Sequence, residues 1–167
     1  TVNGTGRQEK KMIVPMTEEY AVRYLDWSYP EPYEFYNIPR AHYDECLEEV
    51  MENLPYWFAV IDENDRLLGF YEFSFHEENE EKVMEIGLGL CPEETGKGKG
   101  LEFVKQAIAH GRRHFCFPDG PVVLRVLDSN QRAIKTYERA GFKVYGEQKA
   151  SSFGKPVTFL CMKNSGL

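Results

Sequence analysis

The sequence predicts an α/β fold in which helices cover both faces of a mixed, largely antiparallel sheet. Three β-like stretches, 56–62, 67–75 and 83–90, follow one another with only short polar turns between them, which indicates an antiparallel meander. After them, helical patterns alternate with the nearly continuous apolar stretch PVVLRVLD at 121–128, which is typical of an interior strand. The expected order of elements is β-α-α-β-β-β-α-β-α-β-β.

The amino-terminal part is expected to contain one short strand and two helices. MIVPM begins the fold, and Pro15 confines this strand to an edge or a terminus of the sheet. Thr17 is predicted to cap a helix that runs to about Trp27, because two glutamates occupy its first turn. After a loop rich in proline and aromatic residues, a second helix is expected from about Arg40 to Glu52.

The carboxy-terminal half is expected to contain two helices and a closing hairpin. The first helix follows the third β-like stretch and keeps helical spacing at Leu101, Val104, Ile108 and Phe115. The second is capped by Ser129 or Asn130, runs through Ala140 and ends at Gly141 as a left-handed cap. The segments 142–148 and 156–162 alternate well enough to pair as the hairpin.

Length and composition predict one globular domain. The chain has 167 residues, of which 42% are hydrophobic, so we expect a single domain at 12–164 preceded by a polar, flexible tail at 1–11. The net charge of -7 disfavours a general nucleic-acid binder, since such affinity comes mostly from Lys and Arg. No apolar run approaches the roughly 20 residues that span a bilayer, so no membrane partner is expected.

The four cysteines, at 46, 91, 116 and 161, are predicted to be free thiols. They lie far apart, without a C-x-x-C pair and without a histidine at ligand spacing, so no metal site is expected. Free thiols and the lack of a signal-peptide pattern at the amino end predict a cytoplasmic protein.

The stretch CPEETGKGKGLEF, Cys91 to Phe103, places three alternating glycines directly before a helical pattern. A structural turn is one interpretation, and a cradle of backbone amides for phosphate oxygens is the other. A Walker loop does not fit, because Gly98-Lys99 is followed by glycine and not by Ser or Thr. A dinucleotide fingerprint does not fit either, because its third glycine would fall on Leu101 or Phe103.

Two motifs together resemble the GCN5-related N-acetyltransferase (GNAT) superfamily. LGLCPEETGKGKG is similar to the family's apolar-x-Pro strand end and its Arg/Gln-x-x-Gly-x-Gly/Ala loop. About thirty residues later, NQRAIKTYERAGF is similar to the family's Asn-x-x-Ala-x-x-x-Tyr-x-x-x-Gly-Phe helix. The resemblance covers about Met12 to Met162 and is closest to bacterial enzymes that acetylate small molecules or protein amino termini. The loop departs from the family at Thr95, usually Arg or Gln, and at Lys99, where an apolar residue is commoner.

The resemblance implies acetyl-coenzyme A as co-substrate and no metal. Backbone amides of the glycine loop would wrap its pyrophosphate, contributed by Thr95, Gly96, Lys97, Gly98, Lys99, Gly100 and Leu101. The two lysines would add positive charge there, or they are ordinary solvated loop residues. Backbone groups of Leu88 and Leu90 would hold the pantetheine arm, and one amide would polarise the acetyl carbonyl, although as side chains both leucines look like core.

The second motif carries two further expected roles. Asn130 would hydrogen-bond the pantetheine arm; it also fits a plain helix cap, and both roles can coexist. Tyr137 would protonate the departing thiolate as a general acid, whereas without the family its spacing from Ile134 indicates core packing.

An amine must lose a proton before it attacks a thioester, so a base is expected. Glu85 is the favoured candidate because a carboxylate inside the apolar strand VMEIGLGL is unusual, and burial among its neighbours should raise its pKa. Glu72 is the alternative base, with Ser74 and His76 on the same strand face. A solvated sheet edge is the other explanation for these three residues.

The acceptor wall is expected in the first helix and the aromatic loop. The residues are Trp27, Tyr29, Tyr33, Tyr36 and Glu72. The aromatic rings would hold the amine by cation–π contacts and the carboxylate would pair with it, or the same rings only cap the core. His42 and His110 are predicted to lie at the surface.

The expected reaction is direct transfer of acetyl to a primary amine of a small molecule or peptide. A catalytically silent acyl-coenzyme A sensor is the competing function. The sequence predicts a monomer or a homodimer and leaves the acceptor open.

Overall fold

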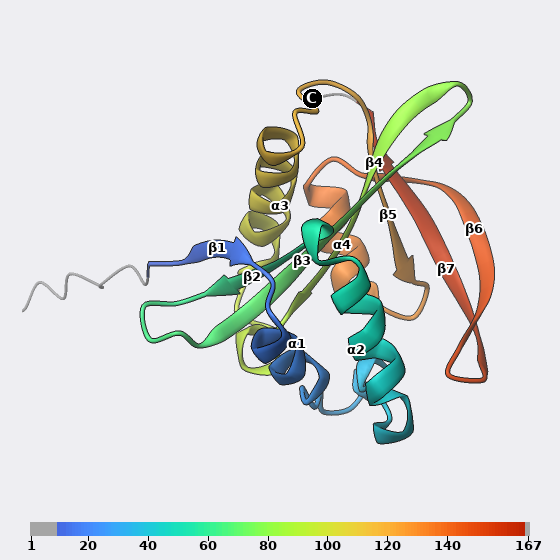
Figure 1. Cartoon of the computed structure of the whole chain (residues 1–167). Coiled ribbons are helices and arrows are strands. Elements are labelled where there is room, and N and C mark those ends of the chain that lie inside the picture. Colours follow the sequence, from blue (N-terminus) through green and yellow to red (C-terminus); the bar gives the residue numbers. More distant parts are fainter. Residues whose placement is uncertain (1–9, 166–167) are drawn as a thin grey trace, which may run out of the picture.

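The structure, a computed structural model, describes residues 10–165 and shows a seven-stranded sheet with four α-helices (Figure 1). The predicted order of elements is confirmed. The strands are β1 (Met12–Pro15), β2 (Trp57–Ile61), β3 (Leu67–Glu78), β4 (Glu81–Leu90), β5 (Val122–Leu127), β6 (Lys143–Ser152) and β7 (Lys155–Asn164). The α-helices are α1 (Glu18–Leu25), α2 (Tyr43–Glu52), α3 (Gly100–His114) and α4 (Gln131–Arg139). Most of the tail predicted at 1–11 lies outside the described residues.

The strands lie in the order β1-β2-β3-β4-β5-β7-β6. The strand containing Pro15 is at an edge, as predicted. The closing hairpin also forms, but its second strand, β7, inserts beside β5 and leaves β6 at the opposite edge. Alternation along each strand predicts the hairpin itself, whereas the choice of neighbour depends on contacts with distant strands.

Strands β4 and β5 form the parallel pair of the described sheet, and they pair only briefly. Met84 lies opposite Val122, and Glu85 lies opposite Val123. Beyond these two positions the described residues of β4 have no further partner in β5, although β4 continues to Leu90. The two strands therefore separate towards their carboxyl ends and leave a gap in the sheet.

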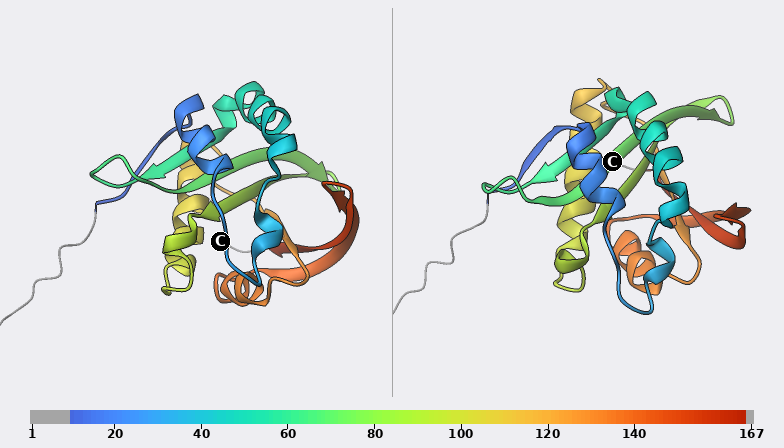
Figure 2. Two further views of the ribbon diagram at one scale, coloured as in Figure 1. Left: turned by 90° about the horizontal axis from the view of Figure 1, so that it is seen from below. Right: turned by 60° about the horizontal axis from the view of Figure 1, so that its bottom comes forward.

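Helices cover both faces of the sheet, as predicted (Figures 1 and 2). Helices α1 and α2 pack on one face through Ala21 and Val50, against Trp57 and Ala59 of β2. Helices α3 and α4 pack on the other face in a larger core, which includes Phe58, Tyr71, Met84, Val104, Leu124, Ile134 and Met162. We call these the α1/α2 face and the α3/α4 face.

The sheet curls so that its distant strands meet at two places. The Tyr145 hydroxyl on β6 donates to the Glu78 carboxylate on β3, with oxygen–oxygen distances of 2.9 and 3.1 Å. Phe153, in the turn between β6 and β7, packs on His42 just before α2, with ring centroids 4.8 Å apart. Figure 2 shows this hairpin curving away from the plane of the other strands. The α1/α2 face therefore borders a partly enclosed space.

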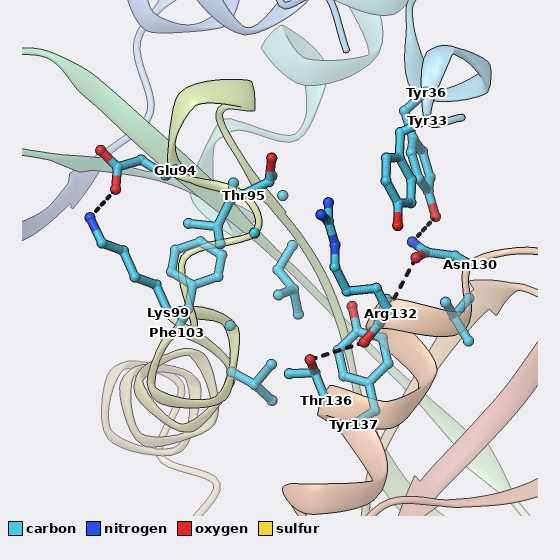
Figure 3. A pocket seen from close by; sticks show the side chains of 18 of the residues that line it. Tyr33, Tyr36, Glu94, Thr95, Lys99, Phe103, Asn130, Arg132, Thr136 and Tyr137 are labelled. Atoms are coloured by element: carbon cyan, nitrogen blue, oxygen red, sulfur yellow. Dashed lines mark hydrogen bonds and ion pairs between the residues drawn. The ribbon is translucent and has the colours of Figure 1, made fainter. Parts of the chain in front are cut away.

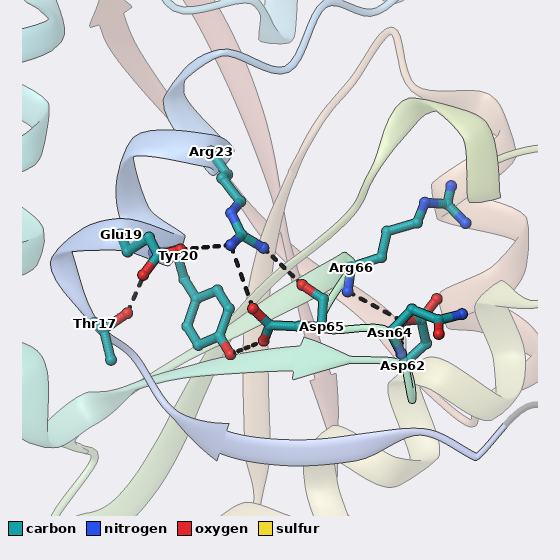
Figure 4. Close-up of polar contacts among 8 residues, drawn as sticks. All are labelled: Thr17, Glu19, Tyr20, Arg23, Asp62, Asn64, Asp65 and Arg66. Carbon is teal, nitrogen blue, oxygen red and sulfur yellow. Dashed lines mark hydrogen bonds and ion pairs between the residues drawn. The ribbon is translucent and has the colours of Figure 1, made fainter.

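Helix α1 is fixed at its start and along its exposed side (Figure 4). The Thr17 side chain accepts from the backbone N–H of Tyr20, as expected of a helix cap. Tyr20 donates to the carboxylate of Asp65 in the β2–β3 turn, and Arg23 donates to the Asp65 carbonyl at 2.6 Å. Asp62 closes that turn by accepting from the backbone N–H of Arg66 at 3.0 Å.

His110 is more buried than the sequence indicates. Its ring packs edge-on against Phe58, with centroids 4.4 Å apart, and stacks on His114. Its Nε2 is buried without a hydrogen-bond partner among residues 10–165. Burial lowers the pKa of His110 below its usual range, and the positive charges of His114 and Arg113 add to this effect.

The lowered pKa predicts a pH-dependent loss of stability. The unfolded chain binds a proton at His110 more readily than the fold does, so the free energy of unfolding should decrease as pH falls through about 6.5. His110→Gln should reduce the difference in stability between pH 7.5 and pH 5.5, as measured by urea unfolding at both pH values.

His42→Gln is the control, because it makes the same substitution at a histidine whose ring nitrogen lies 3.3 Å from the Glu45 carboxylate, outside the core, and it keeps His110. It should retain the His110 contribution. Equal pH dependence in the two variants would show that burial of His110 does not influence acid stability.

Candidate active site

The gap between β4 and β5 opens into a cavity of about 510 Å³ that passes from one face of the sheet to the other. On the α3/α4 face, Phe103, Val104 and Tyr137 line it. On the α1/α2 face, Tyr24 and Phe70 line it. A ligand in this cavity therefore reaches both sides of the sheet, which an ordinary surface groove does not allow.

The glycine loop forms one end of the cavity. Gly96 and Gly98 both have φ of +73°, a conformation that favours glycine. An added Cβ at Gly98 would meet nothing within 4 Å, so the backbone is approachable there. Helix α3 begins at Gly100 with no side chain capping its first turn, which leaves amide donors and the positive end of the helix dipole facing the loop. This geometry fits a diphosphate.

Lys99 does not supply free positive charge to this loop. Its ammonium pairs with Glu94 (Figure 3). Arg66 approaches the same carboxylate at 3.1 Å. Glu94 is only 3% exposed, and the Lys99 hydrogen bond lowers the pKa of its carboxyl despite burial. Two cations therefore surround one buried carboxylate here, and the Lys99 ammonium is directed at Glu94. Lys97 is exposed.

Arg132 is a further cation at the glycine loop, although neither sequence motif assigns it a role. Its Nη1 is 3.3 Å from the position of a Cβ at Gly96, so the guanidinium lies directly beside the glycine loop. The Tyr33 ring lies under it, 4.2 Å from the Arg132 Cζ, and Figure 3 shows the side chain pointing into the cavity. The sequence contains an indication of this role. A positive charge in the first turn of a helix is unfavourable for the helix dipole, yet α4 has Arg132 there and no acidic residue.

Leu88 and Leu90 lie on β4 where β5 has moved away. Their side chains pack against the larger core, as expected, so only their backbone can serve a ligand in the gap. The Leu90 carbonyl already accepts from the Tyr29 hydroxyl at 2.5 Å. This bond ties the aromatic loop to the end of β4.

Asn130 combines the cap that the sequence predicts with a contact that it does not. Its carbonyl oxygen accepts from the N–H of Ala133 at 3.2 Å and caps α4. Its Nδ2 donates to the Tyr36 hydroxyl at 2.6 Å. Asn130 is 9% exposed and lines the cavity, so the amide lies where a ligand in the gap would contact it.

The aromatic loop between α1 and α2 therefore forms one wall of the cavity. Tyr29, Tyr33 and Tyr36 all line it. Trp27, the fourth predicted acceptor residue, lines a separate shallow depression near Arg66 and packs edge-on against Tyr24, with centroids 5.5 Å apart. Trp27 supports the wall from behind and does not contribute to its surface.

Tyr137 lines the cavity from α4. Burial raises the pKa of its hydroxyl well above the usual range, and the nearby Tyr36 hydroxyl adds to the shift. The side chain therefore remains protonated near neutral pH, and its hydroxyl can donate a hydrogen bond to a ligand in the cavity. Its ring packs at 6.1 Å from that of Phe142, so packing and proton donation are compatible.

Glu72 and Glu85 lie on the α1/α2 face. Burial raises the pKa of Glu72 to about 7, with further contributions from the negative charges of Glu49 and Glu85. The carboxylate lies over Gly87 of β4, where an added Cβ would come within 3.1 Å of Oε2. The absence of a side chain at Gly87 thus leaves room for the acid.

Glu85 occupies a different environment from the one expected. Met84 and Ile86 point into the core on the opposite face, because side chains alternate along a strand. The Glu85 carboxylate instead pairs with Arg125 of β5 at 3.5 Å. The expected burial among apolar neighbours is therefore wrong, and Arg125, which also lines the cavity, is a second residue that the sequence analysis missed.

Among residues 10–165, no three His, Cys, Asp or Glu side chains are grouped as ligands for a metal ion. In the same range, no helix is both long and apolar enough to cross a membrane. The four cysteines are free.

Comparison with known proteins identifies the family of the chain. A model of the acetyltransferase (GNAT) family matches residues 17–142. The peptidyl-lysine N-acetyltransferase YjaB of Salmonella typhimurium is 27% identical over 124 residues, which cover 74% of each chain.

Two solved structures show the same fold. A chimera of the spermidine N-acetyltransferase SpeG from Vibrio cholerae and hSSAT superposes with a TM-score of 0.71 and 18% identity, over 93% of this chain and 95% of that chain. The spermidine N-acetyltransferase from Vibrio cholerae in complex with CoA and spermine superposes with a TM-score of 0.69 and 19% identity, over 92% and 94% of the two chains. At these identities the likeness concerns the fold alone.

Proposed function

The chain belongs to the acetyltransferase (GNAT) family, and on this basis we propose that it transfers the acetyl group of acetyl-coenzyme A directly to a primary amine. One observation carries the proposal for this chain. A single cavity joins a phosphate-binding end, made by the glycine loop and Arg132, to Tyr24 and Phe70 on the α1/α2 face of the sheet through the gap between β4 and β5. Donor and acceptor can then meet inside the sheet.

The residues around the gap fit the co-substrate at three points. Gly96, Gly98 and the start of α3 would hold the pyrophosphate, and Arg132 would supply its counter-charge. The backbone of β4 between Gly87 and Leu90 would hold the pantetheine arm as an added strand, with Asn130 as a side-chain partner. A backbone amide there would stabilise the negative charge that develops on the acetyl oxygen.

We assign the base to Glu72 in preference to Glu85. A pKa of about 7 lets Glu72 be substantially ionised and still accept a proton at neutral pH, whereas the Glu85 carboxylate is paired with Arg125. Glu72 would take a proton from the ammonium form of the acceptor, directly or through water. The neutral amine then attacks the thioester carbonyl, the carbon–sulfur bond breaks, and Tyr137 protonates the thiolate. The second proton of the amine nitrogen leaves as the amide forms and restores the Tyr137 hydroxyl through water.

The charges on the α1/α2 face favour a cationic acceptor. Glu49, Glu72 and Glu85 act on one another there, with Arg125 as the opposing charge. Tyr29, Tyr33 and Tyr36 offer ring faces to an ammonium group. We propose an acceptor of this kind, such as a peptide lysine or a small aliphatic amine. We also propose that the protein acts in the reducing cytoplasm, where its cysteines remain free. The relatives named above act on a peptidyl lysine or on spermidine.

The first prediction concerns donor binding. Calorimetry should show that the wild-type protein binds acetyl-coenzyme A, and that Arg132→Ala weakens binding about tenfold because a charge-assisted contact to phosphate is lost. Arg113→Ala, an exposed arginine in the last turn of α3, is the matched control and should bind normally. A wild-type protein that binds ATP but no acetyl-coenzyme A would refute the proposal. A protein that binds acetyl-coenzyme A but releases no free coenzyme A thiol with any amine of a panel would be a silent sensor.

The second prediction separates the two carboxylates. Glu72→Gln should lower kcat about a hundredfold or more near pH 7, because the base is lost while donor binding is kept. The wild-type rate should rise as pH increases through about 7, and the variant should lose this rise and recover partly at higher pH, where the amine is already neutral.

Glu85→Gln is its counterpart and should lower kcat less, and it should keep the pH-dependent rise of the rate, shifted to lower pH because one of the charges that raise the Glu72 pKa is removed. A larger loss in Glu85→Gln than in Glu72→Gln would return the role of base to Glu85. Unfolding gives an independent check: the unfolded chain ionises at Glu72 before the fold does, so wild-type stability should decrease as pH rises from about 4.5 to about 7, and Glu72→Gln should remove that decrease.

The third prediction concerns Tyr137. Tyr137→Phe keeps the packing and removes the proton donor, so kcat should fall about tenfold or more while the Kd for acetyl-coenzyme A changes little. Steady-state kinetics and calorimetry on the same preparation measure both quantities. If kcat is unaltered, the residue serves packing alone.

A further inference from the structure

Phe70 on β3 closes the cavity on the α1/α2 face. It is paired across the sheet with Gly89 of β4, and both residues line the cavity. The ring lies directly on Gly89: an added Cβ there would be 2.5 Å from Cε1 and 3.1 Å from Cζ. No residue other than glycine at 89 would therefore tolerate Phe70 in this position.

The ring cannot retreat, because other aromatic side chains support it from behind. Tyr24 lies at a centroid distance of 4.6 Å, and Trp57 is stacked on the ring at 5.2 Å. Trp27 completes this cluster at 6.1 Å. A partly buried ring held between such neighbours moves only if they move with it.

The direction of the donor follows from the two ends of the cavity. With the pyrophosphate at Gly96 and Arg132, the acyl end of the molecule points away from the glycine loop, into the gap beside Gly89. Further carbons on the acyl group would then meet Phe70 and Tyr24.

We propose that Phe70, seated on Gly89, limits the acyl group of the donor to about the size of acetyl. The proposal rests on the function proposed above and adds a specificity-determining residue to it. Discrimination by a closed apolar pocket is about 10- to 200-fold for each methylene group. The wild-type protein should therefore prefer acetyl- to butyryl-coenzyme A by at least about tenfold, in both Kd and kcat/KM.

Phe70→Ala tests the proposal. The space left by the ring should admit the longer chain, so the preference for acetyl- over butyryl-coenzyme A should narrow about tenfold or more, mainly through tighter binding of butyryl-coenzyme A. Calorimetry with both thioesters measures this ratio without turnover. Phe75→Ala is the matched control: this phenylalanine lies on the same strand, but it packs on Phe115 and Phe117 away from the cavity, and its loss should leave the ratio unchanged.

Gly89→Ala should weaken thioester binding, whereas Phe70→Ala should strengthen binding of the longer thioester. The added methyl group would push the Phe70 ring off its seat, and binding should weaken even for acetyl-coenzyme A. The double variant Gly89→Ala with Phe70→Ala should recover much of that loss, a rescue that general damage to the fold would not produce.

The outcomes separate the two proposals. A wild-type protein that binds neither thioester overturns the function and the inference together. A wild-type protein that binds acetyl-coenzyme A, with an unchanged acetyl-to-butyryl ratio in Phe70→Ala, overturns the inference alone.

Discussion

Strands β4 and β5 share only two paired positions, Met84 with Val122 and Glu85 with Val123, and then separate. A strand edge that loses its neighbour exposes backbone donors and acceptors, which need other partners. Tyr29 satisfies one of them, the Leu90 carbonyl, and the open gap leaves room for a ligand that pairs like a strand. Because the gap crosses the whole sheet, it places the glycine loop and the α1/α2 face in contact with a single cavity. Phosphate binding and proton transfer can thus occur on opposite sides of one sheet.

The charges around this cavity are separated by sign. Near the glycine loop, Glu94 pairs with Lys99 and Arg66, and the Arg132 guanidinium lies beside the loop backbone at Gly96. On the other face, Glu49, Glu72 and Glu85 outweigh Arg125. An anion is favoured at one end and a cation at the other, in a chain whose net charge is -7. This arrangement matches a phosphate-bearing donor and an ammonium-bearing acceptor.

Two glycines of β4 shape the acceptor side. Gly87 and Gly89 leave one side of the strand bare, and Glu72 and Phe70 from β3 occupy the space above them. The same burial that holds Glu72 there raises its pKa to about 7, which suits a base at neutral pH. The lack of side chains at Gly87 and Gly89 therefore allows both the packing of Phe70 and Glu72 on β4 and the raised pKa of Glu72.

The sequence by itself determined the order of elements, the cap at Thr17, the edge position of β1 and the glycine loop, because each depends on neighbours within a few residues. It also identified Asn130 as a cap and Tyr137 as a member of a motif, although their surroundings in the cavity were not visible in it. Tertiary structure alone decided that β7 inserts between β5 and β6, that Lys99 faces Glu94, and that Glu85 faces Arg125. These outcomes depend on residues far apart in the chain, and the alternation of a strand says which residues share a face without saying what lies opposite them. For the same reason the pKa of Glu72 could not be read from its own strand, since the groups that bury and charge it come from α2, β4 and β5.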